Sequence, residues 1–335
     1  MSKRWKIRPE QSTWGDWGED DQLGRLNLID QTKVLQGVAE VKTGKTFCLS
    51  LPLDYPGGQV INKVRFPPVL KPVIRNGEAY YNYDWRKIHP NHTDIGSDDL
   101  VIMYTQYSTQ WDSLAHRGAS FDVWGDGNPQ AVYYNGFPAN ESLQIDAEQN
   151  THAHALGIQH MAKHGVQGRA VLVDLFSEFG EFPRKEVGYE DLMRIMKRDN
   201  IVVEPGDILC LWTGLDQLIM RMAGKPDDSI NKACAVLNGF DESLLQWIID
   251  SGVAAIVSDN LAVEAVGKAV GPRGTNLPIH ELCLFRLGVH LGELWFLADL
   301  ANYLKLEKRS RFLLTAPPLR LTGAVGSPVT PIATV

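Results

Sequence analysis

The chain has 335 residues, which is long for one domain and short for three. Its apolar share of 44% and charged share of 22% are close to globular averages, which excludes a disordered chain, a collagen and a coiled coil. Lys and Arg total 33 against 40 Asp and Glu, so the net charge is −7. Nucleic acid is therefore not an expected partner, because binding it needs a concentrated basic face.

Neither a membrane span nor a disulfide framework is expected. No apolar run approaches the ~18 residues that a bilayer span needs, and no apolar stretch follows the basic first residues, as a secretory signal would require. The four cysteines are scattered without a CxxC pair: Cys48, Cys210, Cys234 and Cys283. These features predict reduced core thiols in a cytoplasmic protein.

The first expected elements are a helix from Asp30, a good N-cap, to about Val41, and a strand over residues 47–53. Residues 54–98 are irregular and rich in proline, but also too aromatic for a disordered linker. Such a long stretch in a compact enzyme usually covers a site or forms a lid or a subunit contact. We therefore expect it to contribute to a homo-oligomer, either a dimer or a tetramer.

Strand and helix signals alternate from residue 100 onward. Apolar runs predict strands at 100–105, 170–175, 208–212 and 253–257. Helical patterns lie between the runs, at 189–198 and at 241–251. This alternation indicates an α/β fold with a central, mostly buried sheet flanked by helices. Residues 1–335 are expected to form one large domain, with an extended tail at 316–335 laid across its body.

Two apparent motifs fail on spacing. Gly44-Lys45-Thr46 lacks the upstream glycine of a P-loop, and His280-Glu281 lacks the second histidine of a zincin helix. A cluster of four histidines lies between residues 152 and 164: His152, His154, His160 and His164. The last two would share the polar face of a short helix, so a surface role is the expected one for this cluster.

One stretch contains several potential ligands, Gln106-Tyr-Ser-Thr-Gln110-Trp-Asp112-Ser-Leu-Ala-His116. If the strand from residue 100 continues, Gln106, Gln110 and Asp112 point to one side, because side chains alternate along a strand. Amide and carboxylate oxygens suit zinc, manganese or magnesium, and the imidazole of His116 would complete the shell or act as a base. The alternative is a polar strand end with a hydrogen-bonded histidine.

A second pair of candidates, His280 and Glu293, lies far downstream. Glu293 stands in a strongly apolar run, where a carboxylate must be paired or bound to a cation. The alternative partner is an arginine such as Arg286. Asp259-Asn260, which follows the predicted strand at 253–257, is a weaker candidate, because sites in α/β folds collect at the carboxyl ends of parallel strands.

These motifs resemble the cyclase family, metal-dependent hydrolases that include bacterial kynurenine formamidase and isatin hydrolase. The family's signature is HxGTHxDxPxH. When its aspartate is aligned with Asp112, its three histidines fall at Gln106, Gln110 and His116. His280 and Glu293 are similar to a His…Glu pair that lies downstream of the signature in the family. Further similar segments are Trp14-Gly-Asp-Trp-Gly, 168–174, 205–214 and 323–328. The resemblance implies a cyclase-like, swivelling β/β/α fold.

The chain departs from the signature at two positions, because Gln106 and Gln110 replace histidines. This QxxxQxD pattern resembles the trans-dienelactone hydrolases, a branch that opens lactones. It implies one divalent cation, Zn or Mn, bound by Gln106, Gln110 and Asp112 with help from His280 or Glu293. It also implies that a small cyclic ester or amide is hydrolysed by metal-activated water, with His116 as the general base.

Three aromatic residues near the motif could wall a ring-sized pocket or belong to the core: Tyr107, Trp111 and Trp124. Two functional alternatives stay open. One is a cyclase-fold protein that has lost its metal and only binds a ligand or a partner. The other is a formamidase or lyase acting on a small aromatic substrate at the same site.

Overall fold

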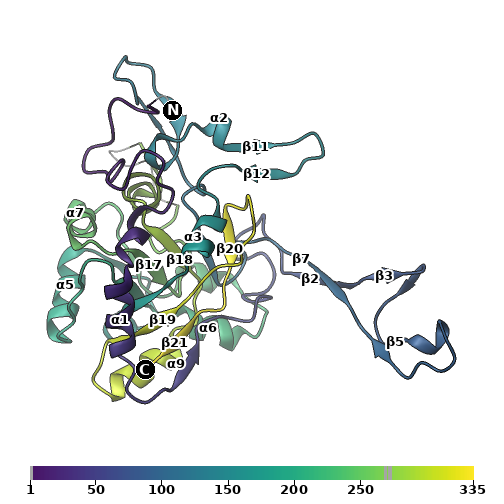
Figure 1. The fold of residues 1–335 in the computed structure, drawn as a ribbon. Coiled ribbons are helices and arrows are strands. Elements are labelled where there is room, and N and C mark those ends of the chain that lie inside the picture. The colour runs from purple at the N-terminus through teal and green to yellow at the C-terminus, as the bar shows by residue number, and fades with distance from the viewer. Residues whose placement is uncertain (1–2, 268–269, 271–273) are drawn as a thin grey trace.

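The computed structural model describes residues 3–267, 270 and 274–335, which fold around a nine-stranded mixed sheet (Figure 1). From edge to edge the strands are β1 (Thr46–Cys48), β21 (Ile332–Thr334), β19 (Arg311–Thr315), β13 (Gln167–Asp174), β15 (Ile208–Trp212), β17 (Ala255–Ser258), β18 (His290–Glu293), β8 (Gln110–Asp112) and β20 (Gly326–Pro328). The four strands β13, β15, β17 and β18 are parallel to one another, and each of the other pairings in this sheet is antiparallel.

The parallel strands are buried on both faces, because alternate residues point to opposite sides of the sheet. Val171 and Val173 of β13 belong to a core cluster that includes residues of α5 (Tyr189–Arg198) and α7 (Glu242–Ser251). Ala170 and Leu172 belong to a second cluster, which includes residues of α9 (Ala298–Leu306). Burial on both sides explains why these strands are continuous apolar runs in the sequence.

Most of the predicted regular elements are confirmed to within a few residues. The helix expected from Asp30 is α1 (Gln31–Ala39), and the Asp30 side chain accepts a hydrogen bond from the Lys33 amide. The helices expected at 189–198 and 241–251 are α5 and α7. The strands expected at 170–175, 208–212 and 253–257 are β13, β15 and β17.

Two expectations about strands differ from the structure. The segment expected as a strand over 47–53 forms only the short strand β1 at its first residues and an isolated bridge between Ser50 and Trp295. The run at 100–105 is a strand over β7 (Asp99–Ile102), but it pairs with β2 (Val69–Pro72) outside the central sheet and does not continue to residue 112. The C-terminal tail supplies two strands to the sheet, β20 at one edge and β21 next to the opposite edge. Local alternation predicts a strand, but it does not predict the partner of that strand.

Residues 62–105, called the arm below, extend away from the body of the molecule (Figure 1). The arm consists of three small antiparallel pairs: β2 with β7, β3 (Ile74–Arg75) with β4 (Glu78–Ala79), and β5 (Tyr83–Asp84) with β6 (Ile95–Gly96). A short 3-10 helix, η2 (Trp85–Lys87), follows β5. Much of the segment expected to be irregular is therefore built from short strands.

Shorter elements complete the described part of the fold. The other strands are β9 (Ala119–Phe121), β10 (Gln130–Val132), β11 (Leu143–Ile145), β12 (Thr151–Ala153), β14 (Glu186–Val187) and β16 (Val236–Leu237). The other helices are η1 (Gly24–Leu28), η3 (Tyr134–Gly136), α2 (Ala139–Ser142), α3 (Ile158–His164), α4 (Phe176–Phe179), α6 (Leu215–Met222), η4 (Asp228–Lys232), α8 (Pro278–His280) and the π-helix η5 (Glu281–Leu287). Among the residues described, none of the helices has the length and apolar character to cross a bilayer.

Candidate metal centre

Strands β8 and β18 bring three of the predicted site residues together: Gln110, Asp112 and Glu293. They pair antiparallel, with Gln110 opposite Glu293 and Asp112 opposite Leu291. The Gln110 side-chain amide donates a hydrogen bond of 3.0 Å to Glu293 Oε2. Gln110 and Asp112 are two residues apart on one strand and therefore share a face of the sheet.

His280 approaches the same face from α8. Its Nε2 lies 3.3 Å from Glu293 Oε1 and 3.9 Å from Asp112 Oδ2. The predicted downstream pair therefore joins the upstream motif in space. Arg286, the alternative partner for Glu293, instead donates to Glu281 at 2.7 Å.

Gln106 and His116 complete the group, although neither lies on a strand of the central sheet. The Gln106 Nε2 atom donates to Asp112 Oδ1 and lies 3.1 Å from His116 Nδ1. His116 Nε2 lies 3.8 Å from Asp112 Oδ2. As placed, Gln106 therefore contacts the cluster through its amide nitrogen, not through the oxygen that a metal ligand would present.

The backbone around Gln106 explains its position. Gly326 of β20 packs against it, and a Cβ atom at 326 would lie only 2.7 Å from the Gln106 Cγ atom. On the other side, Arg65 Nη1 donates a hydrogen bond of 2.6 Å to the Gln106 carbonyl oxygen. The last segment of the chain and the start of the arm thus hold this glutamine against Asp112.

Three of these side chains could contact one cation together. One ligand atom each from Asp112, His116 and His280 lie within 4.8 Å of one another, and these three form the only such group among the residues described. Asp112 Oδ2 and Gln110 Oε1 are buried without a hydrogen-bond partner among those residues. An unpaired buried carboxylate oxygen is costly, so this donor set fits a divalent cation.

The electrostatics of the group reflect its burial. Burial raises the pKa of Asp112, and the nearby imidazole of His116 opposes that rise. Burial alone would lower the pKa of His280, but hydrogen bonds to Glu264 and Glu293 outweigh it and raise the pKa to about 10. For Glu293, burial would raise the pKa, as it does for Asp112, but the hydrogen bond from His280 and the charge of His280 lower it instead. His280 is therefore a cation, paired with carboxylates, when no metal competes for its Nε2 atom.

Glu264 is a member of this site that the sequence analysis missed. Its Oε1 atom lies 2.9 Å from His280 Nδ1 and accepts the His280 backbone amide at 2.8 Å, while Oε2 accepts the Ile279 amide at 3.0 Å. The carboxylate thus orients the imidazole and binds the first turn of α8. It lies in a segment with no expected element, 16 residues before His280, so no local signal marked it.

We expect Glu264→Gln to weaken cation binding by ~10–100-fold, because a carboxylate behind a ligating histidine fixes its orientation and raises its basicity. Equilibrium dialysis against Zn²⁺ would measure the change. Glu186→Gln, a carboxylate on β14, serves as the control and should leave the affinity unchanged. An unaltered affinity in Glu264→Gln would contradict this role.

The three predicted substrate-binding aromatics lie in different surroundings. Trp111 points to the opposite face of β8 from Asp112, is fully buried, and packs on Trp295 with ring centroids 5.0 Å apart. That placement makes Trp111 a core residue and corrects its assignment to a pocket wall. The Tyr107 hydroxyl donates to the Gly58 carbonyl at 3.0 Å, and burial raises its pKa to about 12. Trp124 is 39% exposed and lies in the turn after β9.

The weaker candidates have structural roles. Asp259 is fully buried and accepts hydrogen bonds from Thr213 and Gly214, at the carboxyl end of the neighbouring strand β15. His152 of β12 contacts Asp146, and His154, the residue after β12, contacts Gln144 of the same hairpin. Neither group belongs to the metal-ligand cluster found among the described residues.

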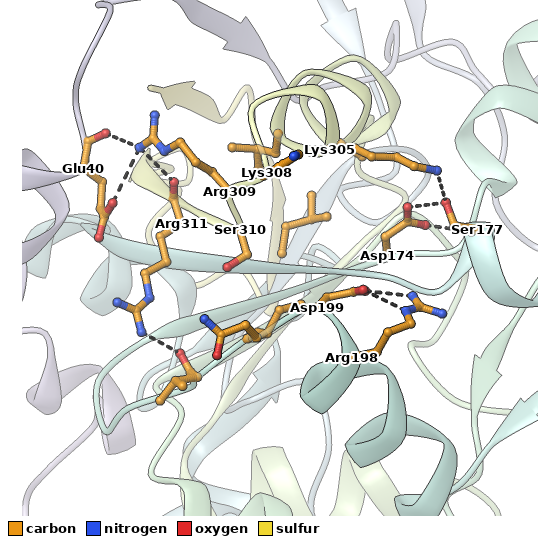
Figure 2. Close-up of a pocket in the computed structure, with 16 residues that line it drawn as sticks. Glu40, Asp174, Ser177, Arg198, Asp199, Lys305, Lys308, Arg309, Ser310 and Arg311 are labelled. Carbon is orange, nitrogen blue, oxygen red and sulfur yellow. Dashed lines mark hydrogen bonds and ion pairs between the residues drawn. The ribbon is translucent and has the colours of Figure 1, made fainter.

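A surface pocket of about 670 Å³ lies away from this cluster, between the end of β13, α9 and the start of β19 (Figure 2). Arg198 pairs with Asp199 there, and Arg309 donates to the Glu40 carbonyl. None of the predicted site residues lines it. The arginines of this pocket therefore already have partners within the chain, and the cluster around Asp112 remains the candidate site.

Comparison with known proteins supports this fold. The Cyclase family model, described as "Putative cyclase", matches residues 49–265. A crystal structure described as a novel cyclase is 29% identical, with a TM-score of 0.78, and the match covers 98% of this chain and 100% of that one. No curated protein matches.

Two isatin hydrolases share the fold at lower identity. Isatin hydrolase A from Labrenzia aggregata is 12% identical with a TM-score of 0.57, over 91% of this chain and 98% of that one. Isatin hydrolase A from Ralstonia solanacearum is 14% identical with a TM-score of 0.54, over 86% and 91%. With most of its length matched by the family model, the chain belongs to the cyclase family.

Proposed function

We propose that this protein is a metal-dependent hydrolase that opens a small cyclic ester or cyclic amide. The observation that carries the proposal is the buried Asp112 Oδ2 atom, which has no hydrogen-bond partner among the described residues although it faces the imidazoles of His116 and His280. Membership of the cyclase family, and a fold shared with isatin hydrolases, support hydrolysis as the reaction.

Asp112 and His280 would hold one divalent cation, zinc or manganese, with Gln106, Gln110 and Glu293 beside them. When bound, such a cation acts as a Lewis acid that polarises a carbonyl oxygen and lowers the pKa of water. Asp112 supplies negative charge in a buried setting, where electrostatic interactions are strong. Glu264 keeps the His280 ring in place.

His116 would transfer the proton. Its side chain is 24% exposed, whereas the side chains of Asp112 and His280 are almost completely buried, so it stands between the cluster and solvent. Imidazole is the commonest general acid–base group in enzymes. In this role His116 takes a proton from the attacking water and returns it to the leaving oxygen or nitrogen.

The substrate class rests on the QxxxQxD motif, which resembles that of lactone-opening enzymes. A cyclic amide is the second candidate, because the isatin hydrolases share the fold. Tyr107 and the partly exposed Trp124 stay predictions for substrate contact.

The test begins with protein purified with Zn²⁺ or Mn²⁺ supplied, followed by elemental analysis and assays on a panel of lactones, cyclic amides and formamides. We expect about one cation per chain, turnover of at least one substrate class, and loss of turnover on chelation. Protein that binds no stoichiometric metal and hydrolyses none of the panel would contradict the proposal and favour a metal-free binding protein.

The role of His116 is tested by His116→Asn. A general base contributes roughly 10²–10⁴-fold to the rate, so kcat should fall by that factor while the cation content is retained. Gln144→Asn, on the β11–β12 hairpin, is the control and should retain full activity. Loss of the cation from His116→Asn would instead make His116 a ligand and exclude it as the base.

We expect cation affinity to rise with pH in the range below about 10. The raised pKa of His280, about 10, means that its Nε2 atom carries a proton at neutral pH when no cation is bound. Binding displaces that proton, so the apparent affinity should increase by up to ~10-fold per pH unit. Zn²⁺ titrations at pH 6, 7 and 8 in two buffers of different ionisation enthalpy would detect the released proton; a pH-independent affinity would contradict this prediction.

A further inference from the structure

Arg65 is a partly buried cation beside the candidate metal centre, and it has no carboxylate partner among the described residues. Its Nη1 atom donates a hydrogen bond of 2.6 Å to the Gln106 carbonyl oxygen, and it forms no ion pair in the part of the chain that the structure describes. A guanidinium has five N–H donors, so one carbonyl oxygen uses only a part of them. Arg169 and Arg286, by contrast, both pair with carboxylates of the chain.

The Arg65 guanidinium lies close to the proposed metal ligands. Gln106 contacts Arg65 through its carbonyl oxygen and Asp112 through its side chain, so a single residue separates this cation from the centre. Burial acts to raise the pKa of Glu293, and the charge of Arg65 is one of the contributions that lower it, after those of the two nearby histidines. The field of Arg65 therefore extends into the site.

The segment that leads to Arg65 is anchored on two sides. The Tyr107 hydroxyl donates to the Gly58 carbonyl oxygen at 3.0 Å, and the Asn231 side-chain amide donates to the Val60 carbonyl oxygen at 3.2 Å. A side chain that discriminates between ligands has to be held in a fixed position. These bonds, together with the one to Gln106, supply that support.

We propose that Arg65 binds a carboxylate of the substrate, and thereby selects cyclic esters or cyclic amides that carry an acidic group beside the ring. This selectivity rests on the proposed function, because the metal centre would position the ring that carries the carboxylate. The planar fork of an arginine matches a carboxylate with two parallel hydrogen bonds. A guanidinium with free donors at the edge of the site is therefore suited to this ligand.

The charge of the site explains why such a substrate needs a fixed cation. Asp112, Glu264 and Glu293 contact one another through His280, and their three carboxylates outweigh a divalent cation by one negative charge when His280 is a neutral ligand. An anion that approaches this site is repelled unless a positive group offsets the excess. Arg65 supplies that positive charge.

The experiment compares two five-membered ring ketones that cannot be hydrolysed, 3-oxocyclopentanecarboxylate and the neutral 3-oxocyclopentanecarboxamide. Their binding to the full-length, Zn²⁺-loaded protein is measured by isothermal titration calorimetry. We expect the wild type to bind the carboxylate ~10–100-fold more tightly, because charge-assisted, bidentate hydrogen bonds are stronger than neutral ones. Arg65→Gln should abolish this preference with little effect on the carboxamide. Arg65→Lys should recover only part of it, because lysine keeps the charge but lacks the fork.

Arg184→Gln is the matched control. The Arg184 guanidinium also donates to backbone carbonyl oxygens, those of Ala233 and Ile230, but it lies outside the metal-ligand group. This variant should keep the wild-type preference for the carboxylate. If Arg65 only positions Gln106, Arg65→Gln would instead weaken both ligands by the same factor, which would overturn the proposal.

Three further results would overturn it: equal affinity of the wild type for the two ligands, no binding of either at millimolar concentration, or a preference that survives in folded Arg65→Gln. The last result would place the carboxylate on the cation instead of on Arg65. Binding of these ketones does not require turnover. A protein that shows the preference but hydrolyses no lactone or cyclic amide would contradict the proposed function and leave the anion selectivity of Arg65 intact.

Discussion

Asp112→Asn is expected to abolish stoichiometric cation binding together with hydrolysis. Asp112 is the one carboxylate in the group with His116 and His280, and it is fully buried. Asparagine keeps the shape but removes the charge that balances a cation in a low-dielectric site. We expect kcat/KM to fall by more than ~10³-fold. Loss of a residue that only orients a metal ligand costs up to ~100-fold, and loss of the ligand itself should cost more. Elemental analysis and steady-state kinetics measure the two effects.

Asp174→Asn provides the control for this substitution. Asp174 ends β13 as Asp112 ends β8, but its carboxylate accepts the Ser177 amide at 2.7 Å outside the cluster. It should retain the cation and its activity. If Asp112→Asn keeps one cation per chain and wild-type turnover, Asp112 is not a ligand and the proposed centre is wrong.

Asp259→Ala should destabilise the protein strongly, although Asp259 is not one of the proposed metal ligands. Asp259 accepts the Thr213 amide, the Thr213 hydroxyl and the Gly214 amide, each at 2.8 Å, and all of these groups are buried. Removing the carboxylate leaves these donors unpaired in the core, at a cost of about 3–5 kcal/mol in the free energy of unfolding. Urea unfolding monitored by circular dichroism would measure the loss.

Asp122→Ala is the matched control, because Asp122 also accepts several backbone amides, including those of Gly125 and Gly127, but in an exposed turn. Water replaces the lost hydrogen bonds there, so its effect should be much smaller. Equal destabilisation by the two substitutions would show that burial is not what makes the Asp259 network important.

The helices and the central strands were predictable because their signals are local. Asp241 caps α7 by accepting the Ser243 amide, and Gly252 ends that helix with a left-handed backbone. The runs that became β13, β15 and β17 are apolar on both faces, which is the pattern of a buried parallel strand. Each of these signals lies within a few residues of the feature it predicts.

The predicted strand from residue 100 to Asp112 shows that local signals do not predict how strands pair. The pattern there was compatible with one long strand, but β7 pairs with β2 in the arm and β8 pairs with β18 and β20 in the body. The residues between the two strands turn, and Gln106 reaches Asp112 across that turn rather than along a strand. The candidate group was predicted, but the geometry proposed for it was wrong.

The sequence by itself determined the α/β class, three of the helices (α1, α5 and α7) and the group of candidate residues whose side chains are chemically able to bind a metal. Only the tertiary structure decided that Glu264 orients His280, that Trp111 belongs to the core, and that the tail supplies strands to the sheet. The reason is physical: caps and periodicity act between neighbours in the chain, whereas strand pairing and the burial of a charge depend on which distant segment arrives beside it.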